Sequence, residues 1–494
     1  MTTRKLTDAH RKLLILGGGV FLAMGGYILA SSFMAGIGYP LDDAWIHQTY
    51  ARNLAQYGEW SFIPGLPSGG STAPLWSALI APAYLVGNKA FVWTMLLGAI
   101  GLFGAAWFGE KWFEKCYEIN TRKIPWAGIF LAFEWHLVWA ASSGMETILY
   151  AAMILLMFWQ LTEKKGNWLA LGLIAGGIVW LRPDGLTLLG PIGYVAFFTE
   201  APYRKKLRAL GLVLGGFLLG FLPYLVFNHF LAGSWWPNTF FAKQAEYAIR
   251  LEAPILSRFL RLAKLPVVGA GVLLVPGFVW VLWQSVIERK WVVQSAGLWW
   301  LGYTLIYAMR LPVDYQHGRY LMPAMPVFFI LGLMGTFDIW RKYLSGSRIL
   351  LVLKKAWVIT LALVLGVFLV IGALQAYSLD VAIINTEMVA AAKWIAVNTP
   401  DDALIAAHDI GALGFYGERN VIDLAGLISP DVIPFIRDEY QLAEHLDNEG
   451  VDFLMTFPGW YAHLPQNANP QFKTGGVYSP LAGGENMTVY EWEN

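Results

Sequence analysis

Long apolar runs separated by short charged breaks constrain this chain more than any other feature of its sequence. A helix needs about 20 mostly apolar residues to cross the hydrocarbon core of a bilayer. The segment 73–87 is apolar but short, with a proline near each end, and we interpret it as entering the membrane without crossing. The pattern predicts an all-α polytopic bundle of about 11 transmembrane helices. The predicted spans lie near 13–35, 90–108, 125–141, 147–162, 167–181, 185–199, 208–231, 266–287, 292–310, 321–337 and 356–377.

The composition agrees with a membrane protein. Hydrophobic residues make up 57% of the chain and charged residues only 14%, whereas a soluble domain is about half apolar and about a quarter charged. The net charge of +1 gives no reason to expect a nucleic-acid partner. The single Cys116 excludes an internal disulfide framework.

The positions of lysine and arginine in short loops predict the orientation of the chain in the membrane, because loops rich in these residues are usually cytoplasmic. The first basic segment is the N-terminus, which includes Arg4 and Lys5. With the basic loops in the cytoplasm, the C-terminal end of the chain lies outside the cytoplasmic membrane. The carboxylates and cations discussed below lie on the same side. The remaining basic segments are 111–123, 164–165, 204–208, 289–290 and 341–355.

The C-terminal segment 378–494 differs from the rest of the chain, since it has no run long enough to span a membrane. Apolar stretches alternate there with turn signals, which is typical of a small soluble α/β domain. We therefore divide the chain into a membrane domain, 1–377, and an extracytoplasmic domain, 378–494. The predicted strands are 403–407, 420–424 and 451–457, and the predicted helices are 390–397 and 441–447.

The first outer loop, about 36–72, carries two adjacent carboxylates directly after a predicted span. In one reading Asp42 caps a helix that has Asp43 in its first turn. An apolar stripe beginning at Ile46 and a stop at Gly58 support that helix. Charge is costly so near the hydrocarbon and tends to be functional there. Because two neighbouring carboxylates interact, one of them can also have a raised pKa and act as a base.

Further charged residues fall on the predicted outer loops, and each also has a structural explanation. Glu146 suits a helix cap or an exposed loop carboxylate, and Arg182 with Asp184 suits a turn with a local ion pair. Lys243 and Arg319 are not explained by the positive-inside rule, although such cations can snorkel to lipid headgroups. The full set is Glu146, Arg182, Asp184, Lys243, His317 and Arg319.

Several short motifs occur in a specific order along the chain. They are Leu41-Asp42-Asp43-Ala44-Trp45-Ile46, Tyr50-Ala51-Arg52-Asn53-Leu54, Ser71-Thr72-Ala73-Pro74-Leu75-Trp76, Gly144-Met145-Glu146, Leu181-Arg182-Pro183-Asp184-Gly185, Pro237-Asn238-Thr239-Phe240 and Gly318-Arg319-Tyr320-Leu321. In this order they resemble the membrane glycosyltransferases of the GT-C superfamily, and most of all the cell-wall arabinofuranosyltransferases that cap arabinan. The resemblance runs from about Leu41 to Leu427. The chain departs from that family at Ala73, where a serine is common.

The resemblance implies an inverting transfer from a polyprenyl-phosphate-linked sugar to a glycan, lipid or protein acceptor outside the membrane. Asp42 is the implied base for the acceptor hydroxyl, with Asp43 as a supporting carboxylate. Lys243 and Arg319 are the implied phosphate ligands. The sugar, the acceptor and any divalent metal stay open, and no cofactor is implied with certainty. The implied substrate-binding residues are His47, Glu146, Arg182, Asp184, Lys243, His317 and Arg319.

Two other classes of protein fit the same composition. A transporter or flippase of a lipid-linked sugar would use outer charged loops to bind its cargo, although such proteins often show paired halves. A structural partner in envelope assembly would bind polymer without chemistry. Turnover of a labelled polyprenyl-phosphate sugar distinguishes the enzyme from both.

Overall fold

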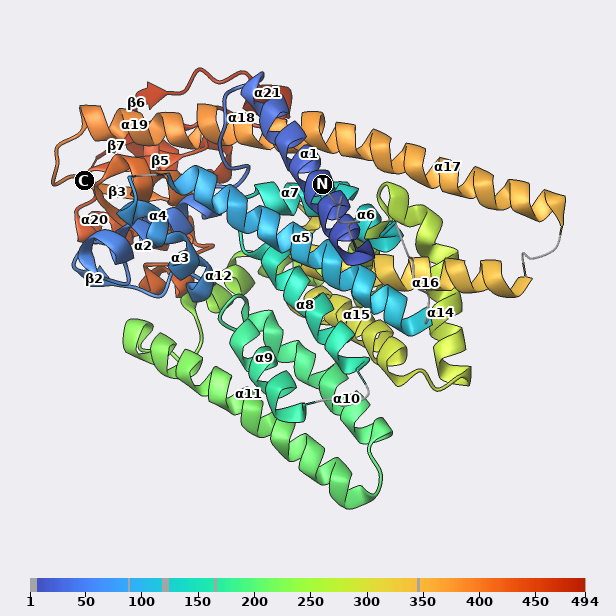
Figure 1. Ribbon diagram of the computed structural model, residues 1–494. Coiled ribbons are helices and arrows are strands. Elements are labelled where there is room, and N and C mark those ends of the chain that lie inside the picture. The colour runs from blue at the N-terminus through green and yellow to red at the C-terminus, as the bar shows by residue number, and fades with distance from the viewer. Residues whose placement is uncertain (1–6, 88, 118–123, 164–166, 344–346, 494) are drawn as a thin grey trace, which may run out of the picture.

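A computed structural model describes residues 7–87, 89–117, 124–163, 167–343 and 347–493. Figure 1 shows a helical bundle with a smaller, partly β-stranded domain at one end. Among the described residues, six helical stretches are long and apolar enough to cross a membrane. They are Asp8–Ser32, Ala90–Cys116, Tyr203–Ala232, Ala270–Ile287, Gln316–Tyr343 and Arg348–Asn398. The basic residues Arg4 and Lys5, the whole of 164–165, and parts of the basic segments 111–123 and 341–355 lie outside the described residues.

Every predicted span coincides with a helical segment, and how many of these segments cross the membrane stays a prediction. Several segments are short or open with a 3-10 turn, so the lengths of the spans vary widely. The bundle helices are α1 (Asp8–Ser32), α5 (Ala90–Tyr117), α6 (Trp126–Phe133), α7 (Trp135–Ser142), α8 (Thr147–Leu161), α9 (Trp168–Ile178), α10 (Leu189–Thr199), α11 (Tyr203–Ala232), α14 (Val275–Ile287), α15 (Trp291–Arg310), α16 (Met325–Tyr343) and α17 (Arg348–Ile371).

The prediction of one continuous helix over 125–141 is wrong. Glu134 has extended backbone angles and separates α6 from α7. Its carboxylate accepts hydrogen bonds from the backbone N–H groups of His136 (3.0 Å) and Leu137 (3.2 Å), so it caps α7. Irregular backbone at membrane depth is tolerated where protein buries it, and Glu134 is fully buried.

The apolar segment 73–87 forms two short helices, α3 (Pro74–Ile80) and α4 (Pro82–Leu85). Pro82 opens α4 directly after Ala81. Together the two helices rise by about 18 Å, which is well short of the roughly 30 Å hydrocarbon core. The segment is therefore too short to span a membrane.

Helices α9 and α11 pack closely through glycines spaced four residues apart. A Cβ added at Gly172 or Gly176 of α9 would lie within 2.3 Å of a backbone oxygen of α11, and one at Gly216 of α11 would lie 2.2 Å from a backbone oxygen of α9. Small residues at this spacing let two membrane helices approach closely without a side chain between them. This contact holds the otherwise exposed α11 on the bundle.

The last membrane helix continues into the C-terminal domain without a loop. Helix α17 is followed by a π-helical turn, η7 (Gly372–Tyr377), then α18 (Ser378–Thr386) and α19 (Met388–Asn398). No described residue of α17 is buried, and Figure 1 shows this helix extending away from the bundle. The predicted boundary at 377/378 therefore falls inside a helical connection.

The C-terminal domain is built around a five-stranded sheet with the order β4-β3-β5-β7-β6. The three predicted strands are confirmed and lie parallel to one another, whereas β7 and β6 add antiparallel edges that the sequence did not predict. Strand β6 is mostly exposed and contains Pro470, so it lacks a clear apolar alternation. The strands are β3 (Leu404–Ala407), β4 (Asn420–Asp423), β5 (Phe453–Thr456), β6 (Ala468–Lys473) and β7 (Thr488–Trp492). The predicted helices 390–397 and 441–447 are confirmed as parts of α19 and of α20 (Glu439–Glu449), whereas the short α21 (Tyr478–Leu481) was not predicted.

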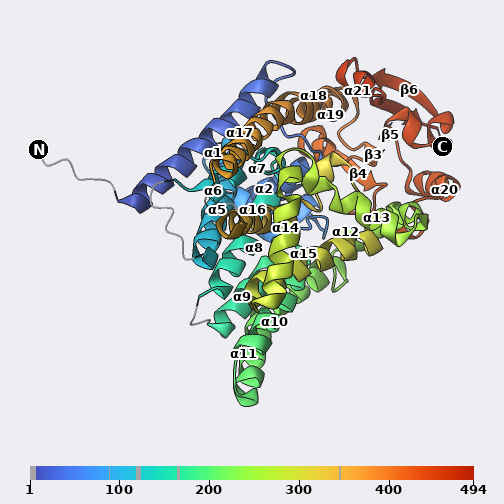
Figure 2. The same cartoon turned by 90° about the vertical axis from the view of Figure 1, so that its right-hand side faces the viewer.

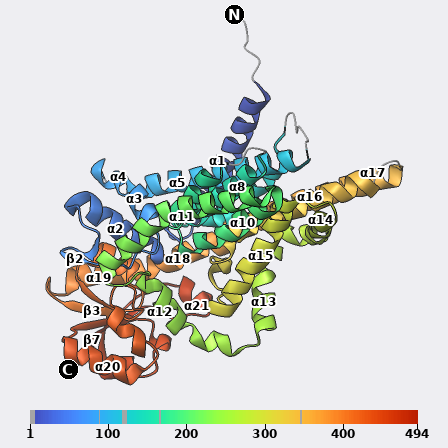
Figure 3. The same cartoon turned by 90° about the horizontal axis from the view of Figure 1, so that it is seen from below.

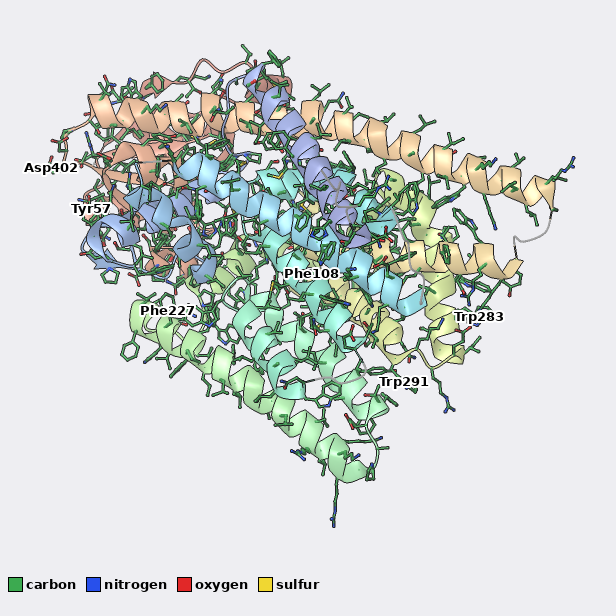
Figure 4. All side chains as sticks on the ribbon, viewed as in Figure 1. Tyr57, Phe108, Phe227, Trp283, Trp291 and Asp402 are labelled. Carbon is green, nitrogen blue, oxygen red and sulfur yellow. The ribbon has the colours of Figure 1, made fainter. Side chains whose placement is uncertain are left out.

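The outer loops bring their own elements to this end of the molecule. Figure 3 shows α2 beside the C-terminal domain, and Figure 2 shows α12 beside the same domain. In Figure 4, Tyr57 and Asp402 lie at the end opposite Trp283 and Trp291. The remaining elements between the bundle helices are α2 (Asp43–Tyr57), β1 (Ser61–Ile63), β2 (Leu66–Pro67), η1 (Pro183–Leu188), α12 (Asn238–Glu246), η2 (Ala248–Glu252), α13 (Ile255–Ala263), η3 (Leu265–Val267), η4 (Ala270–Leu274), η5 (Gln316–Gly318) and η6 (Met322–Ala324).

Candidate active site

Helix α2 carries the first candidate residues, and its existence confirms a sequence prediction. It runs from Asp43 to Tyr57 and ends at Gly58, whose φ of 71° is left-handed and suits glycine. Ile46 is buried, as the predicted apolar stripe requires. The predicted capping role of Asp42 is wrong, because its side chain makes no capping hydrogen bond to α2.

Asp42 instead binds the C-terminal domain. Its carboxylate accepts hydrogen bonds from the backbone N–H groups of Gly411 (2.6 Å) and Ala412 (2.8 Å), which open the helical stretch ending in η8 (Leu413–Gly417). A Cβ at position 411 would lie 2.0 Å from the backbone oxygen of Asp42, so the close approach requires glycine. Burial and the nearby Asp409 raise the pKa of Asp42 to about 8, although the two hydrogen bonds oppose the shift.

Arg52, three turns along α2, binds the other end of the same stretch. Its guanidinium donates hydrogen bonds to the carbonyl oxygens of Phe415 (2.8 Å) and Gly414 (3.1 Å). A carboxylate at the N-terminus of a helical stretch and a cation near its C-terminus both complement its dipole. Asp42 and Arg52 together dock the first outer loop on the C-terminal domain.

A cavity of about 180 Å³ lies on the other side of α2. Its walls come from α2, the loop before α8, η1, α12, α15 and the turn after η5. Asp42 and His317 are not among the residues that line it, which separates them from the rest of the predicted set. The predicted residues that line the cavity are Asp43, His47, Glu146, Arg182, Asp184, Lys243 and Arg319.

Asp43 faces two cations in this cavity. Its Oδ2 accepts a hydrogen bond of 2.8 Å from Arg319, whose guanidinium also donates to the hydroxyl of Tyr320 (3.0 Å). Burial alone would raise the pKa of Asp43, but Arg319 and Lys243 hold it well below its ordinary value. Asp43 is therefore an ionised carboxylate in this arrangement.

A second ion-pair network joins α8, η1 and α15. Arg182 binds Glu146 (2.8 Å) and Asp184 (3.1 Å), so the predicted local ion pair is confirmed and extended. Asp184 also accepts hydrogen bonds from the hydroxyls of Tyr307 (2.6 Å) and Tyr303 (3.3 Å). Glu146 is buried, not exposed, and no described residue gives its Oε2 a hydrogen bond.

His47 lies between Ser77 of α3 and Glu146. Its Nδ1 is 2.9 Å from the hydroxyl of Ser77, and its Nε2 is 3.6 Å from Oε2 of Glu146. Burial lowers the pKa of His47, although Glu146 and Asp43 oppose that shift. The imidazole is accordingly neutral near pH 7 and supports the wall of the cavity.

Lys243 connects the cavity to the C-terminal domain. Its ammonium lies 3.3 Å from Glu246 on the next turn of α12, and Glu246 lies 3.4 Å from Nε2 of His408. Burial opposes the charge on His408, but Asp409 and Glu246 raise its pKa to about 10. These contacts form a buried cation–carboxylate–cation chain between the two parts of the molecule.

The prediction that His317 binds substrate is not supported by its position. Its Nε2 lies 2.8 Å from Asp380 on α18, and its ring packs against Trp135 and Trp139. His317 has a left-handed φ of 58°. The residue therefore joins the bundle to α18.

The sequence interpretation missed Arg310 and Tyr307, which line the cavity, and Glu246, which pairs with the cavity residue Lys243. Arg310 lines the cavity at the end of the span 292–310 and carries the same signal as Arg319, an outer cation that the positive-inside rule leaves unexplained. Glu246 follows Lys243 by three residues, a spacing that favours an ion pair. Tyr307 carried no signal, because a tyrosine inside an apolar run resembles any aromatic packing residue.

The described residues contain no group of three or more His, Cys, Asp or Glu side chains placed to hold a metal ion. The charges in the cavity come from side chains of both signs. Four cations (Arg182, Lys243, Arg310 and Arg319) face three carboxylates (Asp43, Glu146 and Asp184). The excess of one positive charge suits an anionic ligand.

Solved structures share this architecture. The crystal structure of ArnT from Cupriavidus metallidurans bound to undecaprenyl phosphate matches with a TM-score of 0.60 and 13% identity over 96% of this chain and 97% of that chain. The Archaeoglobus fulgidus oligosaccharyltransferase in complex with Zn and sulfate matches with a TM-score of 0.60 and 13% identity over 90% and 67%. The same organism's AglB, in complex with an inhibitory peptide and a dolichol-phosphate, matches with a TM-score of 0.57 and 12% identity over 89% and 69%.

These neighbours are GT-C glycosyltransferases, and the chain has the GT-C fold. Residues 379–490 also match a family model described as a domain of unknown function, DUF8728. The comparison with curated proteins gives no match. The closer resemblance to arabinofuranosyltransferases stays a prediction.

Proposed function

We propose that this chain is an inverting membrane glycosyltransferase that moves a sugar from a polyprenyl-phosphate donor to a glycan, lipid or protein acceptor of the cell envelope. Transfer takes place on the outer face of the cytoplasmic membrane. The observation that carries the proposal is one cavity in which Asp43 faces Arg319 and Lys243. A proton acceptor and phosphate-binding cations thus lie within reach of a single substrate.

The donor phosphate binds the cations on the α12 and η5 side of the cavity. Arg319 is only 7% exposed, and no described residue accepts a hydrogen bond from its Nε. An arginine binds phosphate through two parallel hydrogen bonds, whereas a lysine acts as a compact charge. A neighbour of this fold was crystallised with undecaprenyl phosphate, which supports this class of ligand.

The lipid tail leaves the cavity between α12 and α15. Phe240 and Ile306 line the cavity and are 36% and 45% exposed, so apolar side chains extend from it to the protein surface. A polyprenyl chain gains free energy from such a surface and from the surrounding lipid.

We assign the general base to Asp43 in place of Asp42. Asp42 does not line the cavity, and both of its carboxylate oxygens accept backbone hydrogen bonds from the C-terminal domain. Asp43 lines the cavity and is 28% exposed at its side chain. The two residues are neighbours in the sequence, but only the second can reach an acceptor hydroxyl in the cavity.

Donor binding adjusts the basicity of Asp43. A base works best when its pKa lies near the working pH, and in the empty cavity Arg319 and Lys243 hold the pKa of Asp43 well below its ordinary value. A bound phosphate draws these cations to itself and adds negative charge, and both effects raise the pKa of Asp43. The carboxylate becomes a competent base when the donor is in place.

The transfer then needs one displacement. The acceptor hydroxyl gives its proton to Asp43 as its oxygen attacks the anomeric carbon, and the bond from that carbon to the phosphate oxygen breaks. The electron pair of the broken bond leaves on the phosphate, where Lys243 and Arg319 stabilise it. The transition state is oxocarbenium-like, so the nearby carboxylates also stabilise the sugar.

The test is single-turnover transfer in detergent with a panel of labelled polyprenyl-phosphate pentoses and hexoses. We expect at least one donor to release polyprenyl phosphate as its sugar appears on an acceptor, and the Asp43→Asn variant to bind this donor without transferring its sugar. If liposomes containing the protein move every donor intact across the bilayer and no glycosidic bond is broken, the chain is a flippase and the proposal is wrong.

A further inference from the structure

A second cavity, of about 410 Å³, lies between α12 and the C-terminal domain. Glu246 and Tyr247 line it from the membrane domain, and His408, Arg437, Glu439 and Trp460 line it from the C-terminal domain. Its volume falls within the range of small-molecule sites, about 300–1,000 Å³. None of these residues has a role in the displacement proposed above.

The second cavity adjoins the first through one turn of α12. Lys243 lines the first cavity and Glu246 lines the second, and their ion pair of 3.3 Å lies between the two. Three helical residues correspond to a rise of about 4.5 Å. A ligand in the second cavity therefore lies next to the cations that we assign to the donor phosphate.

Trp460 gives this cavity a rigid aromatic wall. Its side chain is 48% exposed, and its ring meets that of His408 edge-on at 4.8 Å between centroids. The loop after it is fixed by Glu439, whose carboxylate accepts hydrogen bonds from the backbone N–H groups of Ala462 (2.9 Å), His463 (2.6 Å) and Leu464 (3.2 Å). An exposed indole on an anchored loop presents an apolar face at low entropic cost.

The charges around the cavity balance. Glu246 and Glu439 are carboxylates, whereas Arg437 is a cation and His408 is held as an imidazolium by Asp409 and Glu246. These groups offer both hydrogen-bond donors and acceptors without a net charge. Such a wall suits a neutral ligand with many hydroxyl groups better than an anionic lipid or a phosphate.

We infer that this cavity is the acceptor subsite and binds a neutral saccharide, with one sugar ring against Trp460 and its hydroxyls on Arg437 and Glu246. The inference rests on the proposed function, because it identifies the acceptor as a carbohydrate. A sugar held there directs its next residue along α12 toward Asp43. The C-terminal domain thereby presents the acceptor to the donor.

A larger cavity, of about 670 Å³, competes for this role. It is lined by the far end of α2, including Arg52 and Tyr57, and by residues near η8. Arg52 lies nine residues beyond Asp43, a rise of about 14 Å along the helix. The cavity at Trp460 is therefore better placed, and Tyr57, which is 58% exposed, provides a matched aromatic control.

The experiment measures binding of arabinan, mannan and glucan tetrasaccharides to the full chain in detergent by saturation-transfer NMR and titration, without any donor. We expect at least one probe to bind, Trp460→Ala to weaken its affinity at least tenfold, and Tyr57→Ala to leave it unchanged. Arg437→Ala, at an exposed side chain, should weaken the same probe and provides a second variant. Failure of the wild-type protein to bind any probe, equal binding by Trp460→Ala, or a loss confined to Tyr57→Ala each overturns the inference.

A parallel transfer assay separates this inference from the proposed function. If the protein binds a tetrasaccharide through Trp460 but transfers no sugar from any polyprenyl-phosphate donor, the subsite stands and the glycosyltransferase proposal fails. If transfer proceeds and Trp460→Ala leaves the KM for the acceptor unchanged, the function stands and the subsite is wrong.

Discussion

Helix α2 separates two regions that use the same kinds of charged residue for different purposes. On one face, Asp43 and His47 line a cavity in which ion pairs leave a net positive charge. On the other face, Asp42 and Arg52 bind backbone groups at the two ends of one short helical stretch. In the cavity, charges face other side chains that a ligand can displace. In the docking contact they bind backbone N–H and carbonyl groups of the C-terminal domain.

This difference predicts that changes in the cavity alter catalysis without altering stability, and that changes in the docking contact do the reverse. The four predictions below test that division, from the largest expected effect to the smallest.

Asp43→Asn should reduce single-turnover transfer by about 10²-fold or more, the usual scale for a lost general base. Donor affinity and the melting temperature should stay close to wild type, because asparagine keeps the shape of the side chain. Rapid-quench transfer and equilibrium donor binding measure the two quantities. Wild-type transfer by this variant would falsify the assignment of the base.

Lys243→Ala should weaken donor binding by about tenfold or more, since a charge-assisted hydrogen bond contributes about 1.5–3 kcal/mol. Glu246 keeps His408 as a partner at 3.4 Å, so the fold should survive. Titration with a polyprenyl-phosphate sugar measures the effect, and Lys264→Ala, at an exposed site directly after α13, is the control. Equal donor affinity in the two variants would mean that Lys243 does not bind the phosphate.

Asp42→Asn should destabilise the protein by about 1–3 kcal/mol, because the new amide places an N–H group against a backbone N–H group. Transfer should change only a few-fold once the folded fraction is taken into account. Thermal unfolding measures the loss, with the exposed Asp402→Asn as the control (Figure 4). A stable variant that transfers no sugar would return the base to Asp42.

The stabilising contribution of His408 should depend on pH. The folded pKa is raised from 6.5 to about 10, so the contribution is fully present below about pH 6.5 and is lost as the pH rises toward 10. The groups that face the imidazole include Glu246 from α12, Asp409 beside it, the carboxyl of Asp423 at the end of β4 and the ring of Trp460. The difference in melting temperature between wild type and His408→Gln should therefore shrink over this range, and a constant difference would mean that the imidazolium pairing is absent.

Local patterns in the sequence predicted much of the fold. Helix α2 with its stop at Gly58, and the parallel strands β3, β4 and β5, follow from short-range periodicity and turn signals. The break at Glu134 and strand β6 were not predicted, because each depends on its neighbours in space. Glu134 is tolerated in the bundle only because protein buries it, and β6 exists because β7 offers it a partner.

The residues of the candidate site also fall into those that the sequence could identify and those that it could not. Lys243 and Arg319 could be singled out from the sequence, because cations on outer loops have no topological explanation. The roles of Asp42 and Asp43 could not be separated, since both residues follow the same span and belong to the same motif. Side chains at adjacent positions on a helix point about 100° apart. Which of the two carboxylates the C-terminal domain covers depends on how that domain docks, and the sequence does not show this.

The sequence alone determined that this chain is an apolar helical bundle with a small C-terminal α/β domain, because the cost of placing charge and unpaired backbone in lipid leaves few other solutions. The tertiary structure decided which charges meet. Asp43 pairs with Arg319 across 276 residues, and Asp42 reaches Gly411 across 369. Contacts over such separations arise from the packing of whole elements, and no local pattern along the chain encodes them.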